Sequence, residues 1–517
     1  MSDPDDCEPI NVRKIWGEKK RPDRSDPPTD YPLAAITALK NRIHSSQSWL
    51  DIVTMISEHF ATITLDKFYI IQDLGDKISL ISKDTFITQF ANCKMAFDTD
   101  DSSGDKKKVN VAIYWLNSQR VRECDEYLFD PEHAYVAKSP IFNKWRGFAT
   151  HPIKGDCGKL LSYLLNDICN GNEKIKYPWL MSWCAHMFQR PWEKPEIALA
   201  LEGPKGIGKS LLFWILKWLL DGPTKAGKVQ KYYHKVSKSK GLLPRFNVHL
   251  EENILLVSEE ISLVGDKELI GAMTDFITSD TVTVEIKNGP IRDVKSYSRV
   301  GTTINDGHFV PATGDERRWA VFRVSDAHQE QKPYWNEIIQ ELKNGGAEAL
   351  MYVFMNWDIS DFNPRKCPET DELGDQKIDS LKGVTRWWYN KLCTGRLPLF
   401  ERLEPGHNGP CKVITEKVQN DYLRLEKDAW LRTNFSTESF GKQLRRVCPD
   451  FEKKDKIPNM PAYNLGSKAN WVNVYTFPSL NDCRATFLRS QKIRNIEWDE
   501  NVTEWDADLT WIIDGPF

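Results

Sequence analysis

The chain has 517 residues and a nearly balanced charge, with 70 lysines and arginines against 73 aspartates and glutamates. A hydrophobic fraction of 40% and a charged fraction of 28% are ordinary for a folded protein and exclude a disordered one. The formal charge of −3 excludes a protein coated in basic surface, so any contact with nucleic acid must be local.

The cysteines and the apolar stretches exclude secreted and membrane classes. The eleven cysteines are odd in number and form no C-x-x-C pair, which favours free thiols in a reducing compartment over zinc ribbons. The N-terminus is acidic and lacks the pattern of a signal peptide. The most apolar stretch, 211–220, is broken by Lys217 and is too short to span a bilayer. We therefore expect a cytoplasmic protein with no membrane contact.

The first part of the chain predicts a tail followed by a small domain. Residues 1–30 are rich in Asp, Pro, Lys and Arg without periodicity, and they are expected to form a flexible tail. Residues 31–150 are expected to form an N-terminal α+β lead-in domain, with short strands at 67–71 and 77–81.

Helical patterns follow, and then strands alternate with helices. Leucines at helical spacing predict a helix at 158–168, and a second helix is expected at 179–188; together they suggest a helical collar at 151–190. The alternation over 191–350 predicts an α/β domain built on a sheet with crossover connections.

A glycine-rich motif is the strongest single signal. Residues Gly203-Pro204-Lys205-Gly206-Ile207-Gly208-Lys209-Ser210 match G-x-x-x-x-G-K-[ST], after a predicted strand at 197–201 and before a helix at 210–220. Glycines let backbone N–H groups turn toward phosphates at a helix N-terminus. Lys209 would reach the β- and γ-phosphates, and Ser210 would ligate Mg²⁺. The alternative is a glycine-rich turn without a ligand, but the pattern predicts nucleotide binding.

An acidic pair follows the apolar run at 254–257. Glu259 and Glu260 would stand at the C-terminal end of a buried strand. Glu259 or its neighbour would hold the Mg²⁺–water shell, and Glu260 would orient the attacking water. Two solvated glutamates at a strand end are the alternative.

A third apolar strand ends at Asn305, whose amide could hold the lytic water or sense the γ-phosphate. The Asn-Asp-Gly sequence there is also typical of an ordinary turn, and both descriptions can hold.

Downstream, Arg317 and Arg318 precede another strand. They could form a surface pair, a clamp on Asp315, or an arginine finger that reaches a neighbouring subunit's nucleotide, and the sequence leaves open which arginine would act.

A hairpin is predicted at 282–292, where alternating residues flank an Asn-Gly turn. Lys287, Arg292 and Lys295 lie at or near its tip and suit contact with a phosphate backbone. The alternative is a charged edge hairpin that resists aggregation. A second basic run, 225–245, could contact single strands or form a solvated loop.

The last part of the chain predicts a linker at 351–376 and a separate domain at 377–517. A helix at 439–447 would bury Phe440, Leu444 and Val447, and two strand-like runs follow it. A helix followed by a hairpin is the order of a winged-helix module, which places its second helix in a groove of DNA.

Taken in this order, the motifs between residues 203 and 318 resemble the superfamily 3 helicases, most closely the helicase part of phage and plasmid primase-helicases. The resemblance covers about residues 110–325 well. Further matching motifs are Trp115-Leu116, Arg120, Phe129-Asp130-Pro131, Asn143-x-Trp145-x-Gly147-Phe148, Trp183-Cys-Ala-His186, Gln189-x-Pro191, Lys194-Pro195, Phe246-Asn247 and Asp315-x-Arg317-Arg318.

The resemblance implies an α/β P-loop NTPase core of the AAA+-like superfamily 3 type, with an N-terminal α+β domain, a helical collar and a C-terminal winged-helix-like domain. It implies a hexameric ring in which the Lys287 hairpin faces the pore. Ser258 departs from the acidic or small residue of many relatives. The D-x-D motif Asp98-x-Asp100, a candidate primase site, lies in a polar loop, so no primase activity is expected.

The sequence therefore predicts an ATP hydrolase and replicative DNA helicase that uses ATP and Mg²⁺. Its expected partners are single-stranded and forked DNA, further copies of itself, and a separate primase or polymerase, in the cytoplasm of a bacterial host. One rival is a P-loop ATPase that loads or remodels a protein or nucleic-acid partner without unwinding. A second rival is a small-molecule phosphotransferase.

Overall fold

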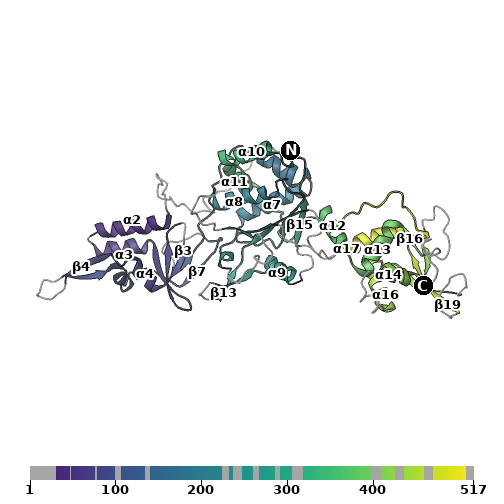
Figure 1. The fold of residues 1–517 in the computed structure, drawn as a ribbon, viewed down its shortest axis with the longest axis horizontal. Helices are drawn as coiled ribbons and strands as arrows, with labels where there is room; N and C mark the ends of the chain where they lie inside the picture. The colour runs from purple at the N-terminus through teal and green to yellow at the C-terminus, as the bar shows by residue number, and fades with distance from the viewer. Residues whose placement is uncertain are drawn as a thin grey trace. The chain divides into compact units, whose positions relative to one another are not determined.

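The computed structural model describes the chain in segments (Figure 1), namely residues 31–46, 48–75, 78–98, 106–133, 140–223, 232–236, 247–259, 267–285, 291–305, 318–398, 409–425, 436–458 and 470–507. Glu260, Lys287 and Arg317, which the sequence analysis singled out, lie outside these segments, as do the tail and most of the basic run. The chain divides into two compact units. The first comprises 1–261, 271–303 and 324–365, and the second comprises 262–270, 304–323 and 366–517.

The lead-in part of the first unit is a four-stranded sheet of order β3-β2-β1-β6, built from β1 (Phe60–Thr64), β2 (Phe68–Asp73), β3 (Ile78–Ile81) and β6 (Glu123–Cys124). The antiparallel pairing of β2 with β3 confirms the two predicted strands. The helices of this part are α2 (Tyr31–Ser45), α3 (Trp49–Ser57), α4 (Lys83–Gln89) and α5 (Val111–Leu116) (Figure 1). They share one aromatic core, in which the Phe86 ring lies 4.9 Å from Phe60 and 5.1 Å from Trp115.

Two short strand pairs complete this part. β4 (Lys94–Asp98) pairs antiparallel with β5 (Lys106–Asn110), and β7 (Glu126–Leu128) pairs parallel with β8 (Ile141–Asn143).

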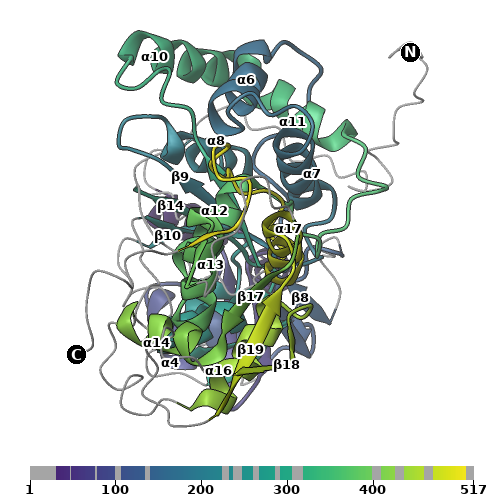
Figure 2. The same cartoon turned by 90° about the vertical axis from the view of Figure 1, so that its right-hand side faces the viewer.

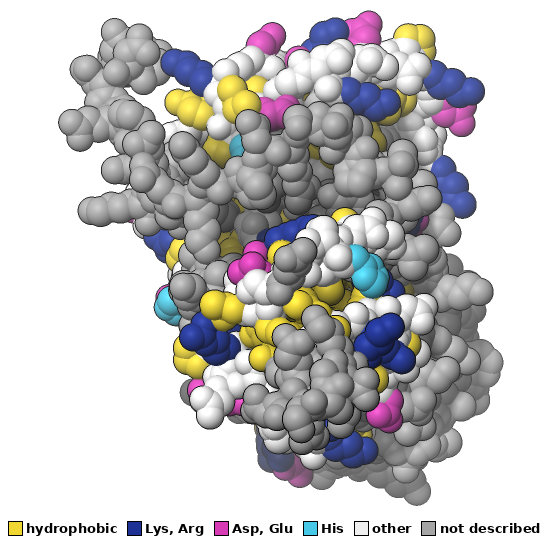
Figure 3. Space-filling view, turned by 90° about the vertical axis from the view of Figure 1, so that its left-hand side faces the viewer, with side chains coloured by type: hydrophobic (Ala, Val, Ile, Leu, Met, Phe, Trp, Pro, Cys, Tyr) yellow, Lys and Arg dark blue, Asp and Glu magenta, His cyan; other side chains and the backbone are white. Residues whose placement is uncertain are grey.

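On the face shown in Figure 3, the described Lys and Arg side chains are scattered among apolar and acidic ones. This distribution fits the balanced net charge. No helix within the described segments is long and apolar enough to cross a bilayer, and the ten described cysteines are free.

The predicted helical segment at 158–168 differs from a regular α-helix. It begins as α6 (Gly158–Ser162) and continues as a π-helix, η2 (Tyr163–Ile168). Such wide turns often occur at functional positions, and this one presents Tyr163 and the buried Asp167 to the segment that follows β15. The second predicted helix is confirmed as α7 (Lys176–Gln189).

The largest described sheet has five strands in the order β10-β11-β14-β9-β15. Its strands are β9 (Ala198–Glu202), β10 (Tyr233–Val236), β11 (Leu255–Glu259), β14 (Arg299–Ile304) and β15 (Trp319–Arg323). β10, β11 and β14 are parallel, and β9 and β14 are buried along their whole length, as strands covered on both faces require. Helix α8 (Lys209–Asp221) packs closely on the sheet, because a Cβ at Gly301 would lie 2.3 Å from the Phe213 ring. The fold is thus a mixed α/β one with a parallel sheet.

The predicted hairpin is confirmed. β12 (Thr281–Glu285) pairs antiparallel with β13 (Ile291–Lys295), with Glu285 opposite Ile291. It follows α9 (Lys267–Thr278) in the chain. After β15, the first unit is completed by α10 (Lys332–Glu341), the π-helix η5 (Leu342–Gly346) and α11 (Ala347–Asn356).

The second unit contains a three-stranded sheet of order β17-β19-β18 packed with helices (Figure 2). In chain order its principal elements are α13 (Gly383–Thr394), β17 (Cys411–Ile414), α14 (Thr415–Leu425), α16 (Thr437–Val447), β18 (Glu452–Pro458), β19 (Trp471–Phe477) and α17 (Leu480–Gln491). Helix α16 buries Phe440, Leu444 and Val447, and the hairpin β18–β19 follows it, as predicted.

The segment 351–376, predicted to be a linker, contains the end of one helix and the start of another. Helix α11 continues to Asn356, and α12 (Asp371–Asp379) begins before the expected boundary. The Thr370 hydroxyl accepts a hydrogen bond from the Leu373 N–H and donates one to the Val321 carbonyl, so it caps this helix and joins it to β15. This contact between distant residues has no signature in the local composition.

Candidate functional site

The glycine-rich motif forms the turn from β9 into α8, and three of its residues need the left-handed backbone. Gly203, Gly206 and Gly208 have φ of +141°, +84° and +89°. Two of them also face crowded surroundings: a Cβ would lie 2.6 Å from the Ile207 side chain at Gly203, and 2.6 Å from the Trp335 ring at Gly208. Backbone conformation favours glycine at all three positions, and at Gly208 the Trp335 ring also leaves no space for a Cβ.

Lys209, the first residue of α8, is buried, and its ammonium points back into the loop. Its Nζ donates hydrogen bonds to the Gly203 carbonyl and to the Pro204 carbonyl, the latter at 2.7 Å. Ser210 is exposed beside it. The loop thus encloses a cation at a helix N-terminus, which is the arrangement that an anionic group requires.

A segment that sequence reasoning missed holds the loop from outside. The Glu330 N–H donates to the Gly206 carbonyl at 3.1 Å, and the Gln329 side-chain amide donates to the Lys205 carbonyl at 2.9 Å. Residues 326–335, which we call the strap, lie between β15 and the second turn of α10. Both bonds use carbonyls of the loop and none of its N–H groups.

Aromatic and acidic side chains fix the strap against η2. Asp167 is buried and binds His328 Nδ1 at 2.8 Å and the Tyr334 hydroxyl, while the His328 and Tyr334 rings stack at 3.7 Å. Tyr163 donates its hydroxyl to the Gly208 carbonyl at 2.9 Å. Burial, aided by Asp167, raises the pKa of Tyr163 well above its ordinary value, so this hydroxyl remains a donor.

Glu259, the predicted metal-holding acid, ends β11 and lies in an ion pair. Its Oε2 is 2.6 Å from Lys235 Nζ on the neighbouring strand β10. The preceding residue, Ser258, points the other way and donates to Thr302 at 2.9 Å in the buried interior of the sheet. Ser258 therefore has a structural partner inside the sheet. Glu259 instead pairs with Lys235 on the neighbouring strand.

Asn305 and Glu259 lie at the same end of adjacent parallel strands. Glu259 pairs in register with Thr303, and Asn305 directly follows β14. Since β14 separates β11 from β9 in the sheet, the strand leading to Asn305 stands between the acidic strand and the one leading to the loop. Arg318 is half-buried and immediately precedes β15. Nothing is described for Glu260 or Arg317.

The hairpin cations do not share one environment. Arg292, predicted at the tip as a contact for a phosphate backbone, lies opposite Val284, one pair from the turn, and its Nη2 lies 2.8 Å from both carboxylate oxygens of Glu251. Lys295 is exposed at the far end of β13, above the Tyr297 ring at 5.2 Å. The Arg292 side chain therefore points toward the segment that precedes β11.

The fold and the site together define a mixed α/β protein with a parallel central sheet and a glycine-rich loop between a strand and a helix. Residues 201–318 match the model of a family of unknown function, DUF5906. This segment contains the loop, the acidic strand, the hairpin and the strand before Asn305. No curated protein matches the chain.

The structure is similar to solved structures of the C-terminal region of NrS-1. Its A-form apo structure has a TM-score of 0.56 at 12% sequence identity, covering 81% of this chain and 97% of that chain. Another apo structure of the region has a TM-score of 0.50 at 16% identity, covering 66% of this chain and 77% of that one. At these identities the likeness concerns the fold.

Proposed function

We propose that this protein is an ATP-dependent DNA helicase of the superfamily 3 type that works as a ring in phage or mobile-element replication. The observation that carries the proposal is the loop at 203–210, with three left-handed glycines and an enclosed Lys209 ammonium. The fold likeness to the C-terminal region of NrS-1 and the resemblance of the motifs support the same class of protein.

The residues around the loop fit a nucleoside triphosphate with Mg²⁺. The N–H groups of 203–210 and the Lys209 ammonium would hold the phosphates, and exposed Ser210 would offer its hydroxyl to the metal. Glu259 would add a carboxylate once it leaves Lys235. Bound Mg²⁺ supplies charge neutralisation on the β- and γ-phosphates. Asn305, at the neighbouring strand end, would position water, together with Glu260.

A ring is proposed because the motif set includes arginines suited to act on another subunit. Arg317 or Arg318 would stabilise the charge that develops on a neighbouring subunit's nucleotide. An arginine finger makes hydrolysis depend on assembly, so the specific activity would fall on dilution. A small-molecule phosphotransferase would show no such dependence on protein concentration.

DNA is proposed to engage the hairpin β12–β13 through Lys287 and Lys295, since Arg292 is held by Glu251. Contacts from such cations go to phosphates and carry no base specificity. The rival, an ATPase that loads or remodels a partner, predicts no role for these lysines. Lys287→Ala therefore discriminates: it should abolish DNA-stimulated hydrolysis and leave basal hydrolysis intact.

The deciding experiment is unwinding of forked duplexes that carry tails of either polarity, with ATP and Mg²⁺. Wild-type protein should separate the strands, and Lys209→Ala should not, because the enclosed ammonium is removed. Measurable ATP hydrolysis without unwinding on any fork would reject the helicase and leave the loading ATPase.

A further inference from the structure

The hairpin β12–β13 is attached at two points to the short segment before β11. On β13, Arg292 binds both carboxylate oxygens of Glu251 at 2.8 Å. On β12, the Asn247 amide donates to the Thr283 carbonyl at 2.8 Å and accepts from the Glu285 N–H at 2.9 Å. Both strands of the hairpin are therefore bound to residues 247–251, which lead directly into the strand that ends at Glu259.

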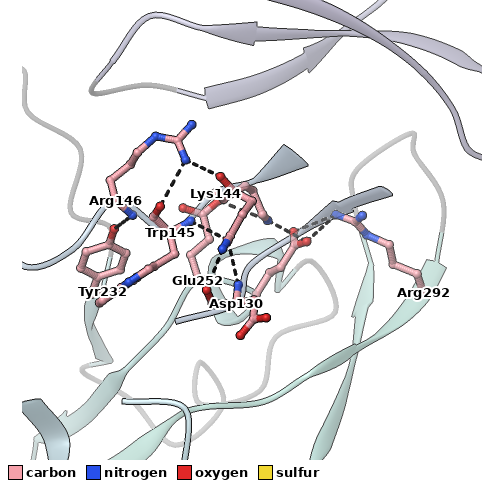
Figure 4. A network of polar contacts seen from close by, with 9 residues as sticks. Asp130, Lys144, Trp145, Arg146, Tyr232, Glu252 and Arg292 are labelled. Atoms are coloured by element: carbon pink, nitrogen blue, oxygen red, sulfur yellow. Dashed lines mark hydrogen bonds and ion pairs between the residues drawn. The ribbon is translucent and has the colours of Figure 1, made fainter. Parts of the chain in front are cut away.

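A buried lysine completes this attachment (Figure 4). Lys144 is 1% exposed, and its Nζ lies 2.7 Å from Glu251 Oε1 and 3.3 Å from Glu252 Oε1. Lys144 and Arg292 also lie over the same Tyr127 ring, at 4.8 Å and 5.7 Å from its centroid.

The contacts extend from Lys144 toward the lead-in sheet. Arg146 binds Asp73, the last residue of β2, at 2.8 Å, and the Arg146 N–H donates to the Tyr232 hydroxyl at 3.1 Å. Figure 4 shows Lys144 between Arg146 and Arg292.

Such a cluster is poorly explained by stability alone. Removing charges from water costs free energy that their mutual attraction hardly recovers, and well-packed apolar residues often do as well in such places. What charged groups add is a defined geometry: Glu251 accepts from Lys144 and Arg292 together, so the hairpin cannot shift without disturbing the segment before β11. The cluster joins two elements that the proposed function must coordinate.

We infer that Lys144, Glu251 and Arg292 form an ionic junction that transmits DNA engagement at the hairpin to the strand carrying Glu259. The inference rests on the proposed function, in which the hairpin contacts DNA and the strand end serves hydrolysis. The three residues are positioning residues. The partner they serve is a nucleic-acid backbone held by the hairpin, and the process they regulate is the stimulation of ATP hydrolysis by that backbone.

The test compares full-length wild type with Arg292→Met, which keeps an apolar stem and removes the charge, and Arg292→Lys. The control is Arg365→Gln, which removes the ion pair of the exposed Arg365 with Glu196 (2.7 Å). For each protein we measure basal hydrolysis, hydrolysis with saturating single-stranded DNA, affinity for that DNA, and thermal unfolding.

Arg292→Met should keep basal hydrolysis and DNA affinity within about twofold of wild type and reduce stimulation at least about fivefold, the low end of coupling between sites. Arg292→Lys should show stimulation between those of wild type and Arg292→Met. The lysine ammonium keeps the charge near Glu251 but lacks the planar, bidentate geometry of the guanidinium. Arg365→Gln should match wild type.

Unchanged stimulation in Arg292→Met overturns the inference, and so does a loss of DNA affinity that accounts for the lost stimulation. If Arg292→Met fails to fold, Arg292→Lys decides: a wild-type ratio of stimulated to basal hydrolysis overturns the junction. Failure of the proposed function would be seen in wild type itself, as an absence of DNA binding and stimulation, whereas failure of the junction is seen only in the variants.

Discussion

Lys235 Nζ and Glu259 Oε2 lie 2.6 Å apart on adjacent parallel strands, with 44% and 28% of their side chains exposed. A pair this accessible is worth only about 0.2–1 kcal/mol in water. A divalent cation that binds Glu259 must break the pair and approach the Lys235 charge. Lys235 should therefore set how much Mg²⁺ the site needs.

Lys235→Met should lower the Mg²⁺ concentration for half-maximal ATP hydrolysis by about two- to fivefold, the equivalent of such a pair. The measurement is a Mg²⁺ titration at fixed ATP. Lys159→Met is the matched control, since Lys159 forms an exposed pair with Glu337 at 2.7 Å outside the site. An unchanged or higher Mg²⁺ requirement would show that Glu259 is not a metal ligand.

Gly208→Ala should abolish nucleotide binding, because the new Cβ would meet the Trp335 ring at 2.6 Å and the backbone is at φ +89°. The loop and the strap must then separate, at a cost of about 1–3 kcal/mol. Binding of a fluorescent ATP analogue and thermal unfolding report the two effects. Gly171→Ala serves as control, since Gly171 also has positive φ (+70°) but no neighbour within 4 Å of a Cβ. If both variants lost nucleotide binding, the loss in Gly208→Ala could not be attributed to the contact between the loop and the strap.

The free energy of unfolding should fall in acid because His186 is buried in its neutral form. Burial, followed by Arg299 and Arg190, lowers the pKa of His186 to about 2, and Arg299 donates to its Nδ1 at 3.1 Å. The unfolded chain takes up a proton below pH 6.5 while the folded chain does not, so stability falls as the pH drops from about 6.5 toward 2. Between pH 7 and 5 the loss should reach up to about 2 kcal/mol.

Thermal unfolding of wild type and His186→Gln between pH 5 and 7 measures this effect. The variant should show a weaker pH dependence than wild type, because Gln still accepts from Arg299 but does not titrate. Equal slopes for the two proteins would mean that other groups control the acid sensitivity.

The C-terminal unit should bind duplex DNA through α16. This helix is packed on β19, where Gly441 faces the Tyr475 hydroxyl, and it exposes Arg446. Arg446→Ala should weaken duplex binding and reduce the slope of log affinity against log salt by about one, the effect of one lost phosphate contact. Arg489→Ala, an exposed arginine on α17 of the same unit, should leave the slope unchanged. Equal slopes for wild type and Arg446→Ala would argue against this face.

Motifs that depend on neighbouring residues were predictable. The loop at 203–210, the hairpin β12–β13 and the buried face of α16 were all visible in the chain, because turn chemistry and side-chain periodicity act over a few residues. The strand before the loop and the helix after it could also be expected, since a loop of this type demands both.

Partners far apart in the chain were beyond such reasoning. Gln329 of the strap binds Lys205 of the loop, 124 residues earlier in the chain. Arg292 binds Glu251, 41 residues earlier. The strand that carries Arg292 could be predicted, but its pairing with Glu251 could not. The start of α12 within the expected linker depends on such a partner too, since the Thr370 hydroxyl that caps this helix also donates to the Val321 carbonyl.

By itself, then, the sequence determined where a glycine-rich loop and a hairpin should form, because local backbone preferences and residue spacing are written along the chain. Only the tertiary structure decided which charges remain available for ligands. Lys235 holds Glu259, and Glu251 holds both Lys144 and Arg292. The physical reason is that burial and the approach of an opposite charge depend on packing between distant segments.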